Sequence, residues 1–115
     1  MRATTTDVLQ LAQMYVARGY NRTGWRKGYD CGCGHTDEII DTSRWAEVDL
    51  TSLCGAVTLA CMDIFGDWYS KPQYAEAIKI LIKASRAWDF DALVSKEFNT
   101  GTQDWALGVL EEALV

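Results

Sequence analysis

No long hydrophobic run occurs in this sequence of 115 residues. The longest weakly polar stretch, residues 53–62, is interrupted by Thr58 and falls far short of the roughly 20 apolar residues that span a bilayer. The first seven residues also lack the apolar run that follows the positive charge of a secretory signal. We therefore expect a cytoplasmic protein that neither crosses nor binds a membrane.

Motifs of common enzymes are missing as well. There is no phosphate-binding loop, no dinucleotide fingerprint and no serine nucleophile elbow. The single histidine, His35, would have to serve any cysteine–histidine catalytic pair, with Cys33 as the nearest thiol. A thiol-dependent enzyme is thus one alternative, although no oxyanion donor or orienting residue accompanies the pair. We expect no enzymatic activity.

The four cysteines do not indicate disulfide bonds. Cys54 and Cys61 are seven residues apart on a predicted helix, which separates their Cα atoms by roughly 10 Å, beyond the reach of a disulfide. Cys31 and Cys33 are too close in sequence to pair without strain. Because Cys54 and Cys61 lie among apolar residues, we expect them to be buried thiols, whereas Cys31 and Cys33 should react first.

A cluster at Cys31, Cys33 and His35 is a candidate metal site. Thiolates and imidazole are the preferred zinc ligands, and the intervening glycines allow the backbone to fold around an ion. Cys54 or Asp37 would supply a fourth ligand. The spacing departs from the usual zinc knuckle, which has two or more residues between its cysteines, so a glycine-rich turn with incidental thiols is the competing interpretation.

Apolar periodicity predicts a mostly α single domain, residues 1–115, built as a compact bundle of four main helices. The first two helices are expected at 6–18 and 50–65, capped by Thr5 or Thr6 and by Asp49 or Thr51. Between them, residues 19–48 form a long irregular glycine-rich excursion that can hold a short hairpin.

Two capping boxes, Ser70–Gln73 and Thr100–Gln103, predict the starts of the third and fourth helices. The third helix is expected to direct one line of residues into the core: Tyr74, Ile78, Leu81, Ser85 and Trp88. Residues 89–98 are predicted to be a connector with at most one or two helical turns. The acids Asp89, Asp91 and Asp104 could form a catalytic or cation-binding group, but a helix start capped by an aspartate explains them more simply.

Charge is unevenly distributed along a chain whose net charge is −5. Residues 8–29 contain no acid, although aromatic and basic side chains alternate there. A globally acidic protein is a poor partner for nucleic acid, whereas a local basic and aromatic surface suits a protein partner. We therefore predict a partner-binding surface in which Trp25 projects from the backbone between Gly24 and Gly28, formed by Arg22, Trp25, Arg26 and Lys27. The competing interpretation is that Trp25 fills the core.

Three short segments resemble a family of short uncharacterised proteins of actinobacteria and their phages. They are Gly24–Gly28 (GWRKG), Ser52–Val57 (SLCGAV) and Phe98–Asn99 ahead of the closing helix 105–114. The acid that usually follows the asparagine in that family is replaced by Thr100. The resemblance implies a compact helical fold in a phage or actinobacterial setting, and it implies no activity.

These observations favour a non-enzymatic binding module, such as a phage-type accessory protein that binds a host protein. The alternative is a small zinc-binding protein that uses Cys31, Cys33 and His35. The sequence alone leaves the partner, the oligomeric state and any toxicity to a host open.

Overall fold

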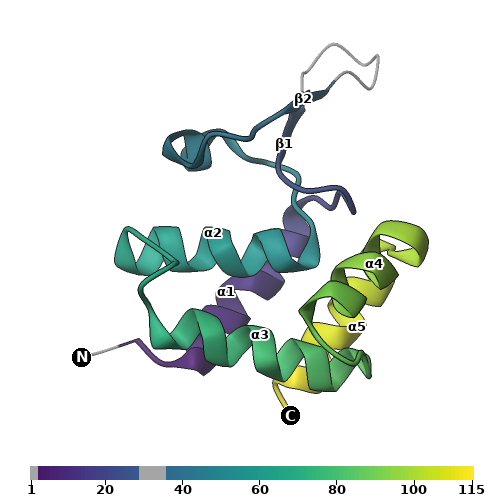
Figure 1. Ribbon diagram of the computed structural model, residues 1–115. Helices are drawn as coiled ribbons and strands as arrows, with labels where there is room; N and C mark the ends of the chain where they lie inside the picture. Colours follow the sequence, from purple (N-terminus) through teal and green to yellow (C-terminus); the bar gives the residue numbers. More distant parts are fainter. Residues whose placement is uncertain (1–2, 29–35) are drawn as a thin grey trace.

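The computed structural model describes residues 3–28 and 36–115. The predicted helical bundle with a small hairpin after its first helix is confirmed (Figure 1). In chain order the elements are α1 (Thr5–Arg18), β1 (Arg26–Gly28), β2 (Thr36–Glu38), the 3-10 helix η1 (Thr42–Glu47), α2 (Leu53–Phe65), α3 (Pro72–Ser85), α4 (Phe90–Thr100) and α5 (Gln103–Ala113).

Side-chain caps fix where α1 and α2 begin. Thr4 caps α1: its hydroxyl accepts a hydrogen bond from the amide of Asp7, whose carboxylate in turn accepts one from the amide of Thr4. Ser52 caps α2 by accepting a hydrogen bond from the amide of Gly55. The predicted caps at Thr5 or Thr6 and at Asp49 or Thr51 are wrong, because neighbouring hydroxyls are equally able to cap and packing selects among them.

The boundaries of α3 differ from the prediction at both ends. Ser70 does not cap the helix, because its hydroxyl donates to the carboxylate of Asp67 instead. The helix ends at Ser85, where Arg86 adopts the left-handed conformation with φ of 62°. Because the helix ends three residues before Trp88, this side chain does not continue the buried line of α3. It is 96% exposed, so its predicted place in the core is wrong.

The predicted connector 89–98 is in fact the greater part of a full helix, α4. Asp89 is its N-cap and accepts a hydrogen bond from the amide of Ala92, which confirms the simpler interpretation of this acid. Thr102, rather than Thr100, caps α5 through the amide of Trp105. The sequence obscured α4 because only Leu93 and Glu97 on this helix are buried, and a buried glutamate interrupts the apolar pattern.

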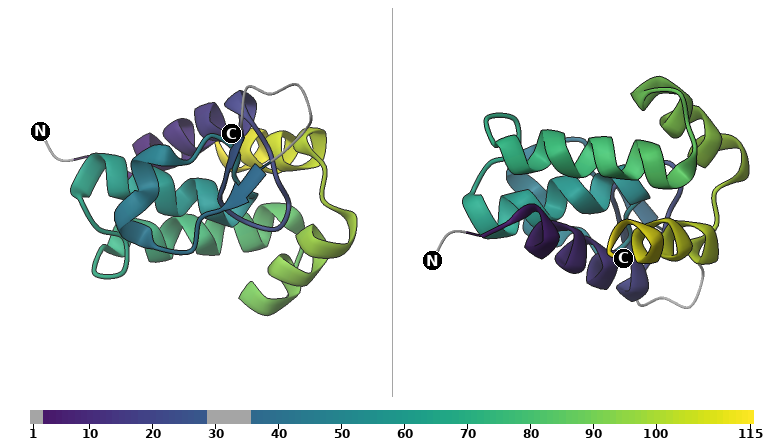
Figure 2. Two further views of the ribbon diagram at one scale, coloured as in Figure 1. Left: turned by 90° about the horizontal axis from the view of Figure 1, so that it is seen from above. Right: turned by 90° about the horizontal axis from the view of Figure 1, so that it is seen from below.

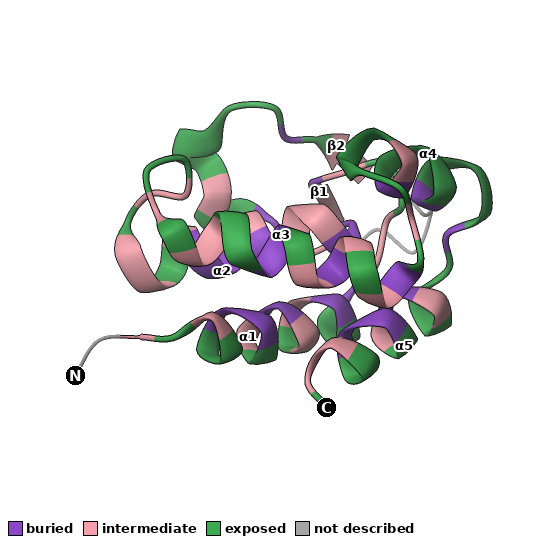
Figure 3. Ribbon diagram, turned by 60° about the horizontal axis from the view of Figure 1, so that its bottom comes forward, coloured by how far each residue is buried: buried purple, intermediate pink, exposed green. Residues whose placement is uncertain are grey.

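The main core lies between α1, α2, α3 and α5, whose buried faces point toward one another (Figures 1 and 3). Small residues of α2, among them Ala56 and Ala60, are fully buried and allow close approach of the neighbouring helices. The largest fully buried side chains of this core are leucines and valines: Val8, Leu9, Val16, Leu53, Val57, Leu81, Leu93 and Leu110.

The hairpin lies on the opposite side of α2 from α1 and α3 (Figure 1). Its strands are antiparallel, with Arg26 opposite Glu38 and Lys27 opposite Asp37. A second, smaller apolar cluster joins this region to α2 and consists of Trp25, Ile39, Val48 and Leu59.

Helix α4 lies at the edge of the bundle (Figure 2) and is largely exposed (Figure 3). Its closest helical neighbour is α3. This position leaves one long side of α4 facing solvent.

Candidate interaction surfaces

Trp25 is buried, so the prediction that its side chain projects into solvent is wrong. Its side chain is 9% exposed, and the indole nitrogen donates a hydrogen bond of 2.9 Å to the carbonyl oxygen of Gly55 in α2. A Cβ at position 55 would lie 3.0 Å from the ring, so the glycine permits this close approach. The indole belongs to the smaller apolar cluster and is not the exposed centre of a binding surface.

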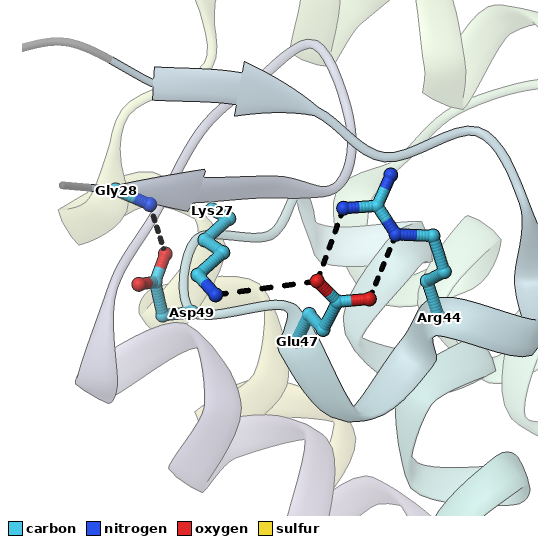
Figure 4. A network of polar contacts seen from close by, with 5 residues as sticks. All are labelled: Lys27, Gly28, Arg44, Glu47 and Asp49. Carbon is cyan, nitrogen blue, oxygen red and sulfur yellow. Dashed lines mark hydrogen bonds and ion pairs between the residues drawn. The ribbon is translucent and has the colours of Figure 1, made fainter.

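One cation of the predicted basic surface, Lys27, lies beside an acid from the following segment. Lys27 Nζ lies 4.0 Å from Glu47, which also receives two hydrogen bonds of 2.7 and 3.0 Å from Arg44 (Figure 4). Asp49 accepts a hydrogen bond of 2.7 Å from the amide of Gly28. The acid-free run in the sequence therefore does not translate into an isolated positive surface.

The other two cations of that surface differ in their surroundings. Arg26 lies on β1 and donates to the hydroxyl of Thr36 on β2, whereas Arg22 is exposed in the turn before the hairpin. With Trp25 buried and Arg26 and Lys27 bonded within the fold, these residues do not form the continuous aromatic and basic patch that was expected. A binding role for Arg22, Arg26 and Lys27 remains a prediction.

The candidate zinc ligands Cys31, Cys33 and His35 lie outside the described residues. Within residues 3–28 and 36–115, no group of three or more histidine, cysteine, aspartate or glutamate side chains is placed to hold a metal ion. Cys54, one of the two suggested fourth ligands, lies in the first turn of α2. The zinc alternative therefore stays a prediction from sequence.

A buried carboxylate joins three distant parts of the chain. Glu97 of α4 is 4% exposed and accepts a hydrogen bond of 2.6 Å from the hydroxyl of Tyr20. The same oxygen accepts one of 2.7 Å from the amide of Leu53, at the start of α2. Together with Ser52, which binds the amide of Gly55, Glu97 supplies acceptors to the first turn of this helix.

Burial controls the ionisation of this network. Loss of solvation raises the pKa of Glu97, opposed by the hydrogen bonds from Tyr20 and from the amides of Leu53 and Cys54. Burial and the neighbouring Glu97 also raise the pKa of the Tyr20 hydroxyl, which therefore stays protonated and donates. Gly101 allows this packing, because a Cβ there would overlap the Tyr20 hydroxyl and the Glu97 backbone.

The raised pKa of Glu97 makes stability depend on pH with a defined sign. Folding favours the protonated carboxyl, so the native state binds more protons than the unfolded chain above the ordinary pKa of 4.5. We expect the free energy of unfolding of the wild type, relative to Glu97→Gln, to fall as pH rises through this window and then to level off. Urea titrations at several pH values between about 4 and 8 measure the difference. A difference that grows with pH would contradict the assignment.

Thiols on α2 are protected, as expected from the sequence for Cys61, which is fully buried. Cys54 as a whole residue is only partly buried, yet burial of its thiol raises the pKa of this group to about 12. Burial likewise raises the pKa of the Cys61 thiol to about 11. We expect Ellman's reagent to modify neither residue in the native state near pH 8 and both after denaturation. Mass mapping of the labelled sites checks this outcome, and fast native labelling of Cys61 would contradict it.

An apolar stripe follows the solvent-facing side of α4. Phe90, Val94 and Phe98, here named the α4 stripe, are spaced by four residues and therefore share one face of the helix. Phe98 is 60% exposed, and the other two are about two-fifths exposed. The fully exposed Trp88 precedes the stripe in the chain.

The N-terminal end of the α4 stripe borders a shallow groove on α3. Phe90 lines this groove of about 330 Å³ together with four residues of α3: Tyr74, Ala75, Ile78 and Lys79. On its other side α4 is anchored by fully buried Leu93 and by Glu97, while Lys96 donates to the carbonyl oxygen of Ser85. The stripe is therefore carried on a helix fixed at several points.

Neither Glu97 nor the α4 stripe was identified from the sequence. The four-residue spacing of Phe90, Val94 and Phe98 is visible in the sequence, but residues 89–98 were predicted to be a connector and not a helix with an exposed face. Glu97 gave no signal of its own, because its partners Tyr20 and Leu53 are 77 and 44 residues away.

These features define a small helical-bundle protein whose edge helix carries an exposed apolar stripe. No protein-family model, curated protein or solved structure matches this chain. Among the described residues, no helix is long and apolar enough to cross a membrane.

Proposed function

We propose that this chain is a non-enzymatic binding module whose contact surface for protein is the α4 stripe. The observation that carries the proposal is the exposure of Phe90, Val94 and Phe98 along one helical face, next to Trp88. Scattered apolar residues on a surface are common, whereas an aligned row of large ones is typical of protein contact sites.

The geometry of the stripe suits recognition of a protein surface. Apolar side chains at four-residue spacing form the ridge by which a helix enters a groove or packs on another helix. Aromatic residues are enriched at the centres of such contacts, and three of the four side chains are aromatic. The internal anchors Leu93 and Glu97 keep α4 in place, which limits the entropy lost on binding.

The phage setting and the host partner rest on the sequence resemblance and are part of this proposal only as its expected context. The surface proposed here differs from the basic surface expected from the sequence. A contact through Arg22 would weaken with salt, since it is electrostatic, whereas a contact through the α4 stripe would not.

Matched bait proteins test which surface is used. Four forms of the chain are immobilised as baits: wild type, Phe98→Glu, Met14→Glu and Arg22→Ala. Each bait is incubated with a lysate of the cells in which the gene acts, to which free copies of the chain have been added, and the captured proteins are identified. We expect Phe98→Glu alone to lose the captured protein, because neither Met14, an exposed apolar residue on α1, nor Arg22, in the turn before β1, belongs to the α4 stripe. Equal capture by all four baits, or no capture of any protein, would contradict the proposal.

A further inference from the structure

We infer that the α4 stripe binds the α4 stripe of a second copy, with the two helices antiparallel about a two-fold axis beside Val94. This inference rests on the proposed function and names the partner of the same surface.

Symmetry of the stripe makes it complementary to itself. Phe90 and Phe98 lie four residues before and four residues after Val94, which is about 6 Å along the helix in each direction. A two-fold axis beside Val94 therefore places Phe90 of one copy next to Phe98 of the other, twice, with the two valines between them. This is the geometry of an isologous interface, in which the same patch serves both partners.

Charges near α4 do not oppose such pairing. The stripe itself is uncharged, and within residues 86–100 the exposed ionic groups balance: Arg86, Lys96, Asp89 and Asp91. Lys79 of α3 is also exposed and lies beside Phe90 in the groove. Lys96 is already bonded to the carbonyl oxygen of Ser85. Antiparallel α4 helices also align their dipoles favourably, and Asp91 of one copy comes level with residue 97 of the other, next to the exposed Lys96.

The available area fits a modest dimer. With aromatic side chains of 150–250 Å² each, the exposed parts of the stripe and Trp88 amount to roughly 500 Å². A standard interface uses about 800 Å² from each partner, so the stripe supplies the apolar centre and neighbouring residues would supply the rim. Trp88 precedes Phe90 by two residues in the chain, so it lies near the end of α4 that Phe98 of the second copy would meet. Interfaces of this size are weak, so we expect the dimer to form only at micromolar or higher concentrations of the chain.

Sedimentation equilibrium over a range from about 1 µM to 1 mM tests the inference directly. We expect the wild type and the matched control Met14→Glu to dimerise, and Phe98→Glu to weaken association at least about 100-fold while its melting temperature stays within a few degrees of the wild type. High salt should leave the wild-type association almost unchanged, because the contact is apolar. A wild type that stays monomeric, or a Phe98→Glu variant that dimerises equally well, would overturn the inference.

Orientation is tested by a double charge substitution in one chain. In the antiparallel pair, Phe90→Lys combined with Phe98→Glu brings opposite charges together at both ends of the stripe, so dimerisation should recover relative to Phe98→Glu and become sensitive to salt. In a parallel pair the same variant brings like charges together and stays monomeric. Recovery therefore supports the antiparallel arrangement, and continued monomer overturns it.

The two proposals fail in different ways. A monomeric wild type whose capture of another protein still depends on Phe98 would overturn self-association and leave the α4 stripe as a contact surface. If Phe98→Glu changes neither self-association nor capture, the contact surface itself is misassigned.

Discussion

Replacing Trp25 by alanine is expected to lower the free energy of unfolding by about 3–5 kcal/mol, the range for large aromatic residues removed from a core. The indole fills the space between the hairpin and α2, and it packs with Ile39, Val48 and Leu59. The substitution also leaves the carbonyl oxygen of Gly55 without the indole donor. Urea unfolding followed by circular dichroism measures the loss.

Trp88 provides the matched control for this experiment. It is the same residue type, but its side chain is 96% exposed and makes no contribution to either apolar cluster. Trp88→Ala should change the free energy of unfolding by less than about 0.5 kcal/mol. If the two variants were equally stable, the position of Trp25 beneath the hairpin would be wrong, and its original assignment as an exposed binding residue would return.

Loss of the Glu97 side chain is the second large effect we expect. Glu97→Ala removes the acceptor of the Tyr20 hydroxyl and of the Leu53 amide at once, both at a buried position. Unsatisfied buried donors are costly, and we expect stability to fall by about 3 kcal/mol. Because the Tyr20 and Leu53 donors lie outside α4, the loss should appear in the global unfolding transition.

Two further variants separate the hydrogen bonds of Glu97 from its charge and from helix propensity. Glu97→Gln keeps one acceptor oxygen without the negative charge. The free energy of unfolding should therefore fall less, relative to the wild type, in Glu97→Gln than in Glu97→Ala. Glu76→Ala changes an exposed glutamate on α3 and should be nearly neutral. Equal effects of Glu97→Ala and Glu76→Ala would remove the structural role assigned to the buried carboxylate.

Local patterns in the sequence predicted much of the fold. The apolar spacing of α1 and α2 placed both helices within a few residues, and the glycine-rich excursion was correctly expected to hold a hairpin. The predicted helix boundaries were less accurate, as with Ser52, whose role as a cap depends on the packing of its neighbours. Trp88 was assigned to the core because the helical period continues to it, whereas the chain turns at Arg86.

The candidate surface was harder to predict, because exposure is a property of the whole fold. Trp25 and Trp88 are both tryptophans with charged neighbours, yet one is buried and the other is almost fully exposed. Similarly, Lys27 belongs to a run without acids in the sequence, yet in the fold its Nζ lies 4.0 Å from Glu47 (Figure 4). Contacts between residues this far apart in the chain are not encoded in any local period.

The hydrogen bonds of Glu97 also couple local opening in two distant parts of the chain. They span 44 residues to Leu53 and 77 residues to Tyr20, so they exist only while α4, Tyr20 and the start of α2 are all in place. A local opening that detaches α4 leaves the amide of Leu53 without this acceptor. The edge helix and the beginning of α2 should therefore exchange their amide hydrogens with solvent as one cooperative unit, although they are far apart in the chain.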